Sequence, residues 1–399
     1  MSNPPDRPDN PERGERPATR LAHAGRDPTR FAGFVNTPVF RGSTILFETV
    51  DGLQGGGGRT TTYGRKGSPS IDALQDTIAE LEGGARTLLT PSGLAAISAT
   101  LLSLVGAGDH ILVADSVYRP TRLFCDGVLA RLGVETTYYD PLIGAGIDAL
   151  LRPNTRLVFV ESPGSQTFEM QDIPAIARHT GPRGIWLVAD NTWASPLYCN
   201  PFRLGVDVSI QSATKYVVGH ADALLGAITC TERASEQVTR GVQALGMTAG
   251  SEEVYLALRG IRTLGVRLER HWRSGLEIAR WFATRPEVAT VLHPALESHP
   301  GHAIWRRDFT GASGLFSIVL KPAPKPAVTA FLESLRLFGM GYSWGGYESL
   351  VVPFDVAAFR TATEWRSEGQ GLRFHIGLED TGDLIRDLEQ GFEVMAALV

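Results

Sequence analysis

The stretch VDVSIQSATKYVVGHAD, residues 206–222, is the part of the sequence that decides the fold. Its apolar start predicts a strand over Val206–Gln211, and a polar turn with Ser212, Thr214 and Lys215 follows at once. Ligands of open α/β sheets gather at the carboxyl ends of the strands. Lys215 is also one of four lysines in a chain with 38 basic residues. Because lysine can lose its proton and arginine cannot, this turn indicates an amine that takes part in chemistry.

Apolar runs on both sides of this stretch predict the rest of a sheet. The predicted strands are Arg86–Thr90, His110–Asp115, Val134–Asp140, Thr155–Glu161, Ile185–Asp190 and Leu224–Thr231. Helical patterns lie between them, at Gly93–Val105 and Pro120–Leu132, and a further helix begins at Ser68-Pro69 and ends at Gly83. Runs such as ILVA (111–114) are apolar on both faces. This is typical of a parallel sheet that helices cover on both sides, so we expect an α/β domain.

The chain outside this domain divides into two further parts. Residues 251–285 are helical in pattern, and strands at Thr290–His293, Gly314–Lys321 and Leu372–Ile376 then alternate with helices. We therefore expect an α/β domain over residues 68–259 and a smaller α+β domain over residues 260–399. Residues 1–20 are charged and proline-rich, which predicts a disordered arm. Residues 21–67 read as an extended segment without a core of its own, which needs another surface such as a second subunit.

The composition excludes several classes of protein. The 399 residues carry a net charge of −5 and no basic block, so no nucleic-acid partner is expected. Three widely spaced cysteines fit neither a disulfide framework nor a metal site, and they favour a reducing compartment. The N-terminal residues lack the apolar segment of a secretory signal, and the longest uncharged stretch, residues 93–108, is too short to span a bilayer. These features predict a cytoplasmic protein without a membrane partner.

Four positions at predicted strand ends carry the remaining chemistry. Gly93 opens a helix directly after the first strand, an arrangement that suits a phosphate but also fits a plain turn. Tyr118 follows the second strand, where its ring could stack on a planar ligand or could simply pack against neighbouring side chains. Asp190 ends a strand as a buried acid, and Lys215 supplies an amine. Together they meet the needs of pyridoxal phosphate, whereas the rival dinucleotide site lacks its GxGxxG turn.

Five motifs in order carry a resemblance to a known family. They are YGRKGSPS (63–70), SGLAAI (92–97), VADNTW (188–193), SATKYVVGHAD (212–222) and RFHIGLED (373–380). From about residue 35 onward the sequence resembles the Cys/Met-metabolism family of pyridoxal-phosphate enzymes, which have the aspartate-aminotransferase-like fold, fold type I. One mild departure is Ala221, where a polar or small residue is commoner.

The resemblance implies a role for each matching position. Lys215 would bind the cofactor covalently and act in catalysis, Asp190 would pair with the pyridine nitrogen, and Tyr118 would stack on the ring and assist catalysis. The phosphate would be held by Gly93, Leu94, Ser212 and Thr214. From a neighbouring subunit, Tyr63 and Arg65 would reach the cofactor, and Tyr63 would help to transfer protons. Substrate would be bound by Arg373, which clamps its carboxylate, together with Ser343 and Trp344. No metal is implied.

Two details favour one reaction within the family. Trp344 resembles the residue at this point of the bacterial cystathionine β-lyases. Gly164-Ser165 also resembles them, because γ-acting members usually have Thr-Asn there. We therefore expect cleavage of an amino-acid thioether, cystathionine plus water giving homocysteine, pyruvate and ammonia, in a homotetramer built as a dimer of active dimers. A γ-acting lyase or synthase of the family is the alternative, and a non-catalytic cofactor-binding protein is a more distant one. The preference among cystathionine, cystine and cysteine stays open.

Overall fold

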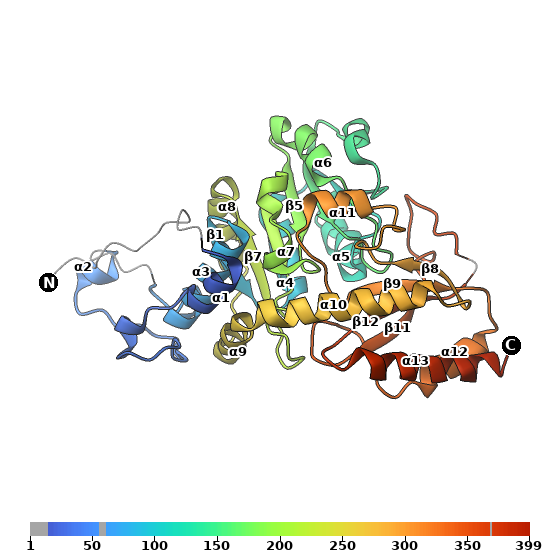
Figure 1. Cartoon of the computed structure of the whole chain (residues 1–399). Coiled ribbons are helices and arrows are strands. Elements are labelled where there is room, and N and C mark those ends of the chain that lie inside the picture. Colours follow the sequence, from blue (N-terminus) through green and yellow to red (C-terminus); the bar gives the residue numbers. More distant parts are fainter. Residues whose placement is uncertain (1–14, 56–60, 368) are drawn as a thin grey trace.

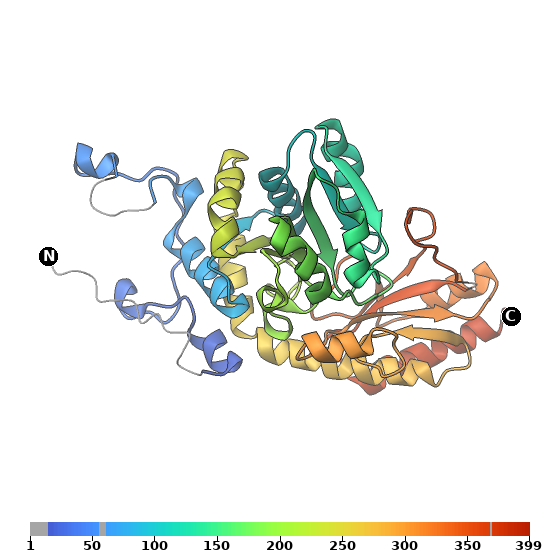
Figure 2. The same ribbon diagram turned by 90° about the horizontal axis from the view of Figure 1, so that it is seen from above.

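The computed structural model describes residues 15–55, 61–367 and 369–399 of the chain. Two layered units of sheet and helix lie along the helix α10 (Leu264–Ala283), and the N-terminal segment extends from the far side of the larger unit (Figures 1 and 2). The N-terminal segment and the last helix, α13 (Thr381–Ala396), therefore lie at opposite ends of the molecule (Figure 1). In the described ranges, no helix is long and apolar enough to cross a membrane.

Seven strands of the described chain form the larger sheet in the order β1-β7-β6-β5-β4-β2-β3. Their bounds are Arg86–Thr90 (β1), His110–Ala114 (β2), Glu135–Tyr139 (β3), Thr155–Glu161 (β4), Trp186–Asp190 (β5), Val208–Gln211 (β6) and Gly226–Cys230 (β7). All seven lie where the apolar runs predict strands. The parallel arrangement holds for β3, β2, β4, β5 and β6, but β7 runs antiparallel to both of its neighbours. The segment between β6 and β7 contains no helix that could carry the chain back across the sheet, so the strand returns in the opposite direction.

Helices cover both faces of this sheet. Alternate residues of a strand point to opposite sides, so Phe159 packs with α4 (Gly93–Leu104) and α8 (Glu232–Ala244), while Val158 packs with α6 (Ile173–Thr180). The same side as α6 is extended by α3 (Pro69–Glu82) and α9 (Ser251–Arg262) over β1 and β7. The helix predicted over Pro120–Leu132 is α5 (Arg119–Phe124), which continues as a π-helical turn at Cys125–Leu129. A single turn, α7 (Ser195–Tyr198), follows β5.

The C-terminal unit is a five-stranded sheet in the order β10-β11-β12-β9-β8, with helices packed against it. Its strands are Val288–Leu292 (β8), Leu315–Leu320 (β9), Gly339–Met340 (β10), Leu350–Phe354 (β11) and Gly371–His375 (β12). Its helices besides α10 and α13 are α11 (His302–Asp308) and α12 (Lys325–Ser334). Buried aromatic side chains form the core, among them Phe282 of α10, Phe316 of β9 and Phe392 of α13. The strands β10 and β11 were not predicted from the sequence.

The helical pattern of residues 251–285 is divided into α9 and α10 at Thr263. The first turns of α10 pack in the core of the larger unit through Leu264 and Leu268, and its last turns pack in the smaller core through Ile278 and Phe282. This helix therefore joins both cores. The domain limits at residues 259 and 260 fall inside α9 and stay a prediction.

The N-terminal segment has short helices but few buried residues. Residues 1–14 of the predicted disordered arm lie outside the described residues, and Pro17–His23 forms α1. Single helical turns follow at Pro28–Phe31, at Val50–Leu53 (α2) and at Gly64–Lys66. Large apolar side chains on this segment are exposed: Phe34, Val35, Leu46, Val50 and Leu53. Figure 2 shows the segment stretched away from the sheets, and the role of residues 21–67 as a separate extension stays a prediction.

Candidate active site

A cavity of about 710 Å³ opens at the carboxyl ends of the parallel strands. Residues that follow β2, β4, β5 and β6 line its floor, and the C-terminal unit closes its other side. Ten of the residues predicted for the site line it: Gly93, Leu94, Tyr118, Asp190, Ser212, Thr214, Lys215, Ser343, Trp344 and Arg373. Tyr63 and Arg65 do not.

Lys215 lies in a tight turn after β6. The turn is closed by two backbone hydrogen bonds, from Lys215 N to Ser212 O (3.0 Å) and from Gly219 N to Lys215 O (2.8 Å). The side-chain Nζ donates to Ser343 Oγ at 2.5 Å and lies 5.3 Å from the centre of the Trp344 ring. Burial, with a smaller contribution from the Arg373 charge, lowers the pKa of Lys215 to about 8, although Asp190 opposes this. Near neutral pH the amine can therefore lose its proton readily.

Asp190 ends β5 with one carboxylate oxygen engaged and one open. Its Oδ1 accepts hydrogen bonds from the backbone N–H (3.0 Å) and the hydroxyl (2.6 Å) of Thr192. No donor within the described residues bonds Oδ2, and the residue lines the cavity. Burial raises the pKa of Asp190, so a cationic partner at Oδ2 would favour the ionised carboxylate.

A second acid, Glu161, lies beside Asp190 and was not predicted. The two residues are paired in register at the ends of β4 and β5, and both line the cavity. Glu161 Oε2 accepts a hydrogen bond from Tyr118 N at 2.7 Å, which holds the start of α5. Burial and then the nearby Asp190 raise the pKa of Glu161 well above its usual value. The apolar run predicts that Glu161 ends a strand, but its place beside Asp190 follows only from the register of β4 against β5.

The start of α4 forms an anion cradle with the turn after β6. Ser92 caps the helix, and the N–H groups of Gly93 and Leu94 find no hydrogen-bond partner in the described chain. Gly93 approaches so closely that a Cβ there would lie 2.6 Å from Ser212 Oγ. The hydroxyl of Thr214 is already paired with Leu225, donating to its O (3.1 Å) and accepting from its N (2.9 Å). The free N–H groups and the helix dipole suit a phosphate.

Arg373 projects from β12 into the cavity with its charge unmatched. Its Nη2 donates to Ser343 O at 3.2 Å, and the described residues offer it no carboxylate. Burial lowers the pKa of Arg373 to about 10, still far above neutral, so the side chain is a cation. A substrate carboxylate would satisfy this guanidinium.

The cavity wall contains further residues that the sequence did not reveal. Arg119 and Phe359 meet there, with the guanidinium carbon 5.5 Å from the ring centre. Arg360 also lines the cavity, but it is paired with Glu169 at 2.7 Å. These residues belong to a loop and a helix start with no recognisable pattern, so no sequence signal pointed to them.

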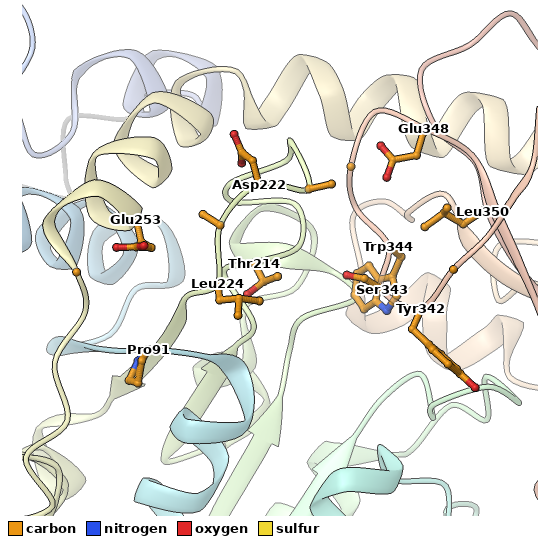
Figure 3. Close-up of a pocket in the computed structure, with 15 residues that line it drawn as sticks. Pro91, Thr214, Asp222, Leu224, Glu253, Tyr342, Ser343, Trp344, Glu348 and Leu350 are labelled. Carbon is orange, nitrogen blue, oxygen red and sulfur yellow. The ribbon is translucent and has the colours of Figure 1, made fainter.

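Tyr63 and Arg65 lie outside the cavity of their own chain. Tyr63 is half exposed beside the turn at Gly64–Lys66, and Arg65 Nη1 donates to Gln243 O at 3.0 Å. A second hollow of about 950 Å³ borders the cavity and shares five lining residues with it: Thr214, Leu224, Tyr342, Ser343 and Trp344. Figure 3 shows Tyr342, Ser343 and Trp344 on one side of this hollow and Thr214 and Leu224 on the other. Its carboxylates are Asp222, Glu253 and Glu348.

Comparisons with known proteins identify the family. Residues 18–393 match the model of the Cys/Met-metabolism PLP-dependent enzymes, so the chain belongs to that family. It is 49% identical, over 95% of its length and 96% of the relative, to a Rhizobium johnstonii protein provisionally assigned as a cystathionine beta-lyase. Cystathionine beta-lyase MetC of Escherichia coli is 44% identical over 94% of this chain and 97% of its own. The structure of metB from Corynebacterium glutamicum superposes with a TM-score of 0.88 at 31% identity, covering 95% of this chain and 98% of that chain.

These findings confirm the predicted fold and cofactor class. The chain has the aspartate-aminotransferase-like fold type I, and its family depends on pyridoxal phosphate. The site fits that group, because it offers an amine of lowered pKa at Lys215 and an open carboxylate oxygen at Asp190. The cradle at Gly93, Leu94 and Ser212 fits the phosphate.

Proposed function

We propose that this protein is a carbon–sulfur β-lyase that converts cystathionine and water to homocysteine, pyruvate and ammonia. The names of the relatives from Rhizobium johnstonii and Escherichia coli support this reaction. One arrangement in the site carries the proposal. A lysine amine of lowered pKa, Lys215, shares its cavity with the open carboxylate of Asp190 and the unmatched cation of Arg373. Amine, acid and carboxylate clamp are the groups that such an elimination needs.

Lys215 has two tasks in this proposal. Pyridoxal phosphate, when bound, supplies an electron sink for the negative charge that develops at the substrate Cα. Lys215 would hold the cofactor, and its neutral amine would take the Cα proton of the bound substrate. Because its pKa is about 8, a useful fraction is neutral near pH 7. The same amine would pass that proton to the homocysteine sulfur as the Cβ–S bond breaks, with Tyr118 and Tyr63 as further proton donors. The three-carbon fragment would leave as aminoacrylate, which water hydrolyses to pyruvate and ammonia.

The remaining residues orient the reactants. Asp190, through its open Oδ2, would keep the ring nitrogen of the cofactor protonated, and Tyr118 would stack on the ring. The phosphate is held by Gly93, Leu94 and Ser212, and Thr214 joins them only if its bond to Leu225 changes. Arg373 binds the carboxylate beside the reacting carbon, while Ser343 and Trp344 form the wall next to it.

The two unpaired arginines of the cavity support cystathionine as the substrate. Arg373 and Arg119 both line it, and neither has an acidic partner among the residues that the structure describes. Cystathionine carries a carboxylate at each end, so one guanidinium can bind each end. Arg360 forms an ion pair with Glu169 and is therefore not available to bind a substrate carboxylate.

Two features of the wall support β- over γ-elimination. γ-Elimination needs a second proton removed from Cβ, and the substrate must shift to allow it. The indole of Trp344, 5.3 Å from Lys215 Nζ, limits such a shift. Gly164 packs so closely that a Cβ would lie 2.5 Å from Ser116 Oγ, so the larger residue of γ-acting members does not fit there.

A product assay tests the proposed reaction. Purified enzyme loaded with pyridoxal phosphate is incubated with cystathionine, and both keto acids are quantified. The proposal requires pyruvate as the main product and none from the matched Lys215→Ala variant. If 2-oxobutyrate dominates, the enzyme is a γ-lyase. If cofactor binds and neither acid forms, it is not a lyase of cystathionine.

We further propose a homotetramer, a dimer of active dimers, in which Tyr63 and Arg65 complete the site of a neighbouring subunit. Charge supports this, because the hollow beside the cavity carries Asp222, Glu253 and Glu348, whereas residues 65 and 66 are basic. Mixing inactive Lys215→Ala chains with inactive Arg65→Ala chains should restore activity in hybrid oligomers. Hybrids that form and stay inactive would refute shared sites.

We also propose that the enzyme works in the cytoplasm. Cys125, Cys199 and Cys230 are buried free thiols in the described structure, which suits a reducing compartment. Fractionation of cells that express the protein from its own gene would test this location: recovery in the cytosolic fraction supports it, and recovery in a secreted or membrane fraction refutes it.

A further inference from the structure

Strand β12 holds the loop 342–346 at two points. Arg373 and His375 are two residues apart, so their side chains lie on the same face of the strand. Arg373 Nη2 donates to Ser343 O at 3.2 Å. His375 Nε2 lies 3.1 Å from Gly345 N and 3.2 Å from Gly346 O. The proposed chemistry gives Arg373 a task and leaves His375 without one.

The loop that His375 contacts brings three groups to Lys215. Ser343 Oγ accepts from Lys215 Nζ, and the Trp344 ring lies next to that nitrogen (Figure 3 shows both loop residues at the wall). Gly345, with φ +88°, lies directly on the lysine backbone, since a Cβ there would be 2.9 Å from Lys215 Cα and 2.8 Å from its C. Whatever fixes Gly345 therefore also fixes Ser343 and Trp344 relative to the amine.

A second buried histidine lies behind His375. His271 of α10 and His375 are 0% and 1% exposed, and their ring centres are 5.2 Å apart. Burial lowers the pKa of His271 to about 4 and that of His375 well below its usual value, so both rings are neutral near pH 7. A neutral imidazole has one donor and one acceptor nitrogen. His271 Nδ1 is 2.8 Å from Ile376 O and must carry the hydrogen, which leaves Nε2 as an acceptor.

The tautomer of His375 follows from the unpaired nitrogens. Within the described chain, His271 Nε2 and His375 Nδ1 are buried without a partner. If His375 Nε2 donated to Gly346 O, its Nδ1 would be an acceptor beside the acceptor of His271, and both would stay unpaired. If Nε2 instead accepts from Gly345 N–H, Nδ1 carries a hydrogen that complements His271 Nε2. Buried polar groups are nearly always paired, which favours the second arrangement.

We propose that His375 is a positioning residue of the active site. As the Nδ1–H tautomer, it donates toward His271 Nε2 through a bridging water, and it accepts the hydrogen bond of Gly345 N–H. A chain of contacts thus runs from Ile376 O through both rings to the loop that carries Ser343 and Trp344. His375 holds this loop in place against Lys215 and touches neither substrate nor cofactor.

The test compares two substitutions of His375 with a control. His375→Phe fills the space but offers no acceptor, whereas His375→Gln offers an amide oxygen to Gly345 N–H and an amide N–H to Gly346 O. His293→Phe is the control, because His293 is also fully buried in the C-terminal unit, and its hydrogen bond and ring contact within the described residues are with Ala295 and Phe316 and not with the loop or Lys215. Each variant is loaded with pyridoxal phosphate, and the visible absorbance of the bound cofactor is titrated with pH.

We expect His375→Phe to move the pH midpoint of that absorbance by about half a unit or more, because the hydrogen bond to Ser343 is disturbed. His375→Gln and His293→Phe should keep the wild-type midpoint. In cystathionine cleavage, His375→Phe should lower kcat roughly tenfold or more with a much smaller change in KM, since misplacement by about 1 Å can cost on the order of 10²-fold. Equal behaviour of the Phe and Gln variants, or an equal shift in His293→Phe, would overturn the proposal.

Two further points keep this test decisive. If His375→Phe does not yield folded protein, the same titration of His271→Leu replaces it: a shifted midpoint supports the proposal and an unchanged one overturns it. The kinetic comparison rests on the proposed function, but the absorbance titration uses no substrate. Failure of the wild type to form pyruvate would therefore refute the proposed function and leave the titration as an independent test.

Discussion

Replacing Gly93 by alanine should weaken cofactor binding through a collision that the structure defines. A Cβ at this position would lie 2.6 Å from both Cβ and Oγ of Ser212 and 3.1 Å from its Cα. Carbon atoms in contact are ordinarily about 3.5–4.0 Å apart, so the overlap approaches about 1 Å. Rotation of the Ser212 side chain cannot remove it, because the Cβ and Cα atoms do not move with χ1. The start of α4 must therefore move away from Ser212, which opens the anion cradle.

The magnitude follows from the cost of such overpacking. An extra methyl group in a tightly packed place costs about 1–3 kcal/mol. Because each 1.4 kcal/mol is tenfold in an equilibrium constant, the dissociation constant of pyridoxal phosphate should rise roughly 5- to 150-fold. This assumes that the strain is relieved mainly at the cradle, where the N–H groups of Gly93 and Leu94 have no other partner in the described chain.

Titration of apoprotein with pyridoxal phosphate, followed by visible absorbance, measures this effect. Gly127→Ala is the matched control, since Gly127 also lies in a helical turn and a Cβ there meets no atom within 4 Å. Its dissociation constant should equal that of the wild type. If Gly93→Ala binds within about twofold of the wild type while folded, the cradle does not depend on this close approach and the reasoning fails.

Three more predictions concern the amine, the carboxylate clamp and the wall. The pKa of Lys215 is lowered from 10.5 to about 8 in the folded apoprotein. Below pH 8 the buried lysine is protonated, which destabilises the folded state, and this destabilisation disappears as the pH rises toward 10.5. Lys215→Met apoprotein should therefore resist urea better than the wild type at pH 7, by about 3 kcal/mol, with no gain near pH 10.5; a pH-independent difference would contradict this. Arg373→Lys should raise KM for cystathionine roughly 10- to 100-fold, because a point charge cannot replace two parallel hydrogen bonds, and an unchanged KM would remove Arg373 from the clamp. Trp344→Ala should raise the 2-oxobutyrate share of the keto acids, whereas a slower enzyme with the same product ratio would show that the indole only packs.

The strands could be predicted where apolar runs are long, and their directions could not. ILVA and LVFV mark β2 and β4 because a covered parallel sheet needs apolar side chains on both faces. Periodicity carries no information on direction, so the antiparallel course of β7 was missed. Strand β11 was not predicted because it contains Pro353. Proline has no N–H to donate and normally argues against a strand, but in this sheet Pro353 lies in register with Leu372.

Site residues could be predicted where one short motif shows both where a side chain lies in the fold and which chemical group it offers. Asp190 ends β5, and Ser212 and Lys215 follow β6, so all three lie where neighbouring strand ends meet at one edge of the sheet. Glu161 required the register of β4 against β5, which sets it beside Asp190 and which no single strand reveals. Arg119 and Phe359 lie more than 200 residues apart and meet only because the C-terminal unit closes over the cavity. Tyr63 and Arg65 lie outside the cavity of their own chain, and their roles in the site of a second subunit stay proposals.

A deuterium isotope effect tests the central claim most directly, because it shows which half of cystathionine reacts at Lys215. Two substrates are compared, one with deuterium at Cα of the three-carbon half and one with deuterium at Cα of the four-carbon half. Removal of the first proton by Lys215 should make kcat/KM smaller for the three-carbon label and leave it unchanged for the four-carbon label. An effect from the four-carbon label alone would mean that the substrate binds the other way round for γ-elimination, which would contradict a β-lyase.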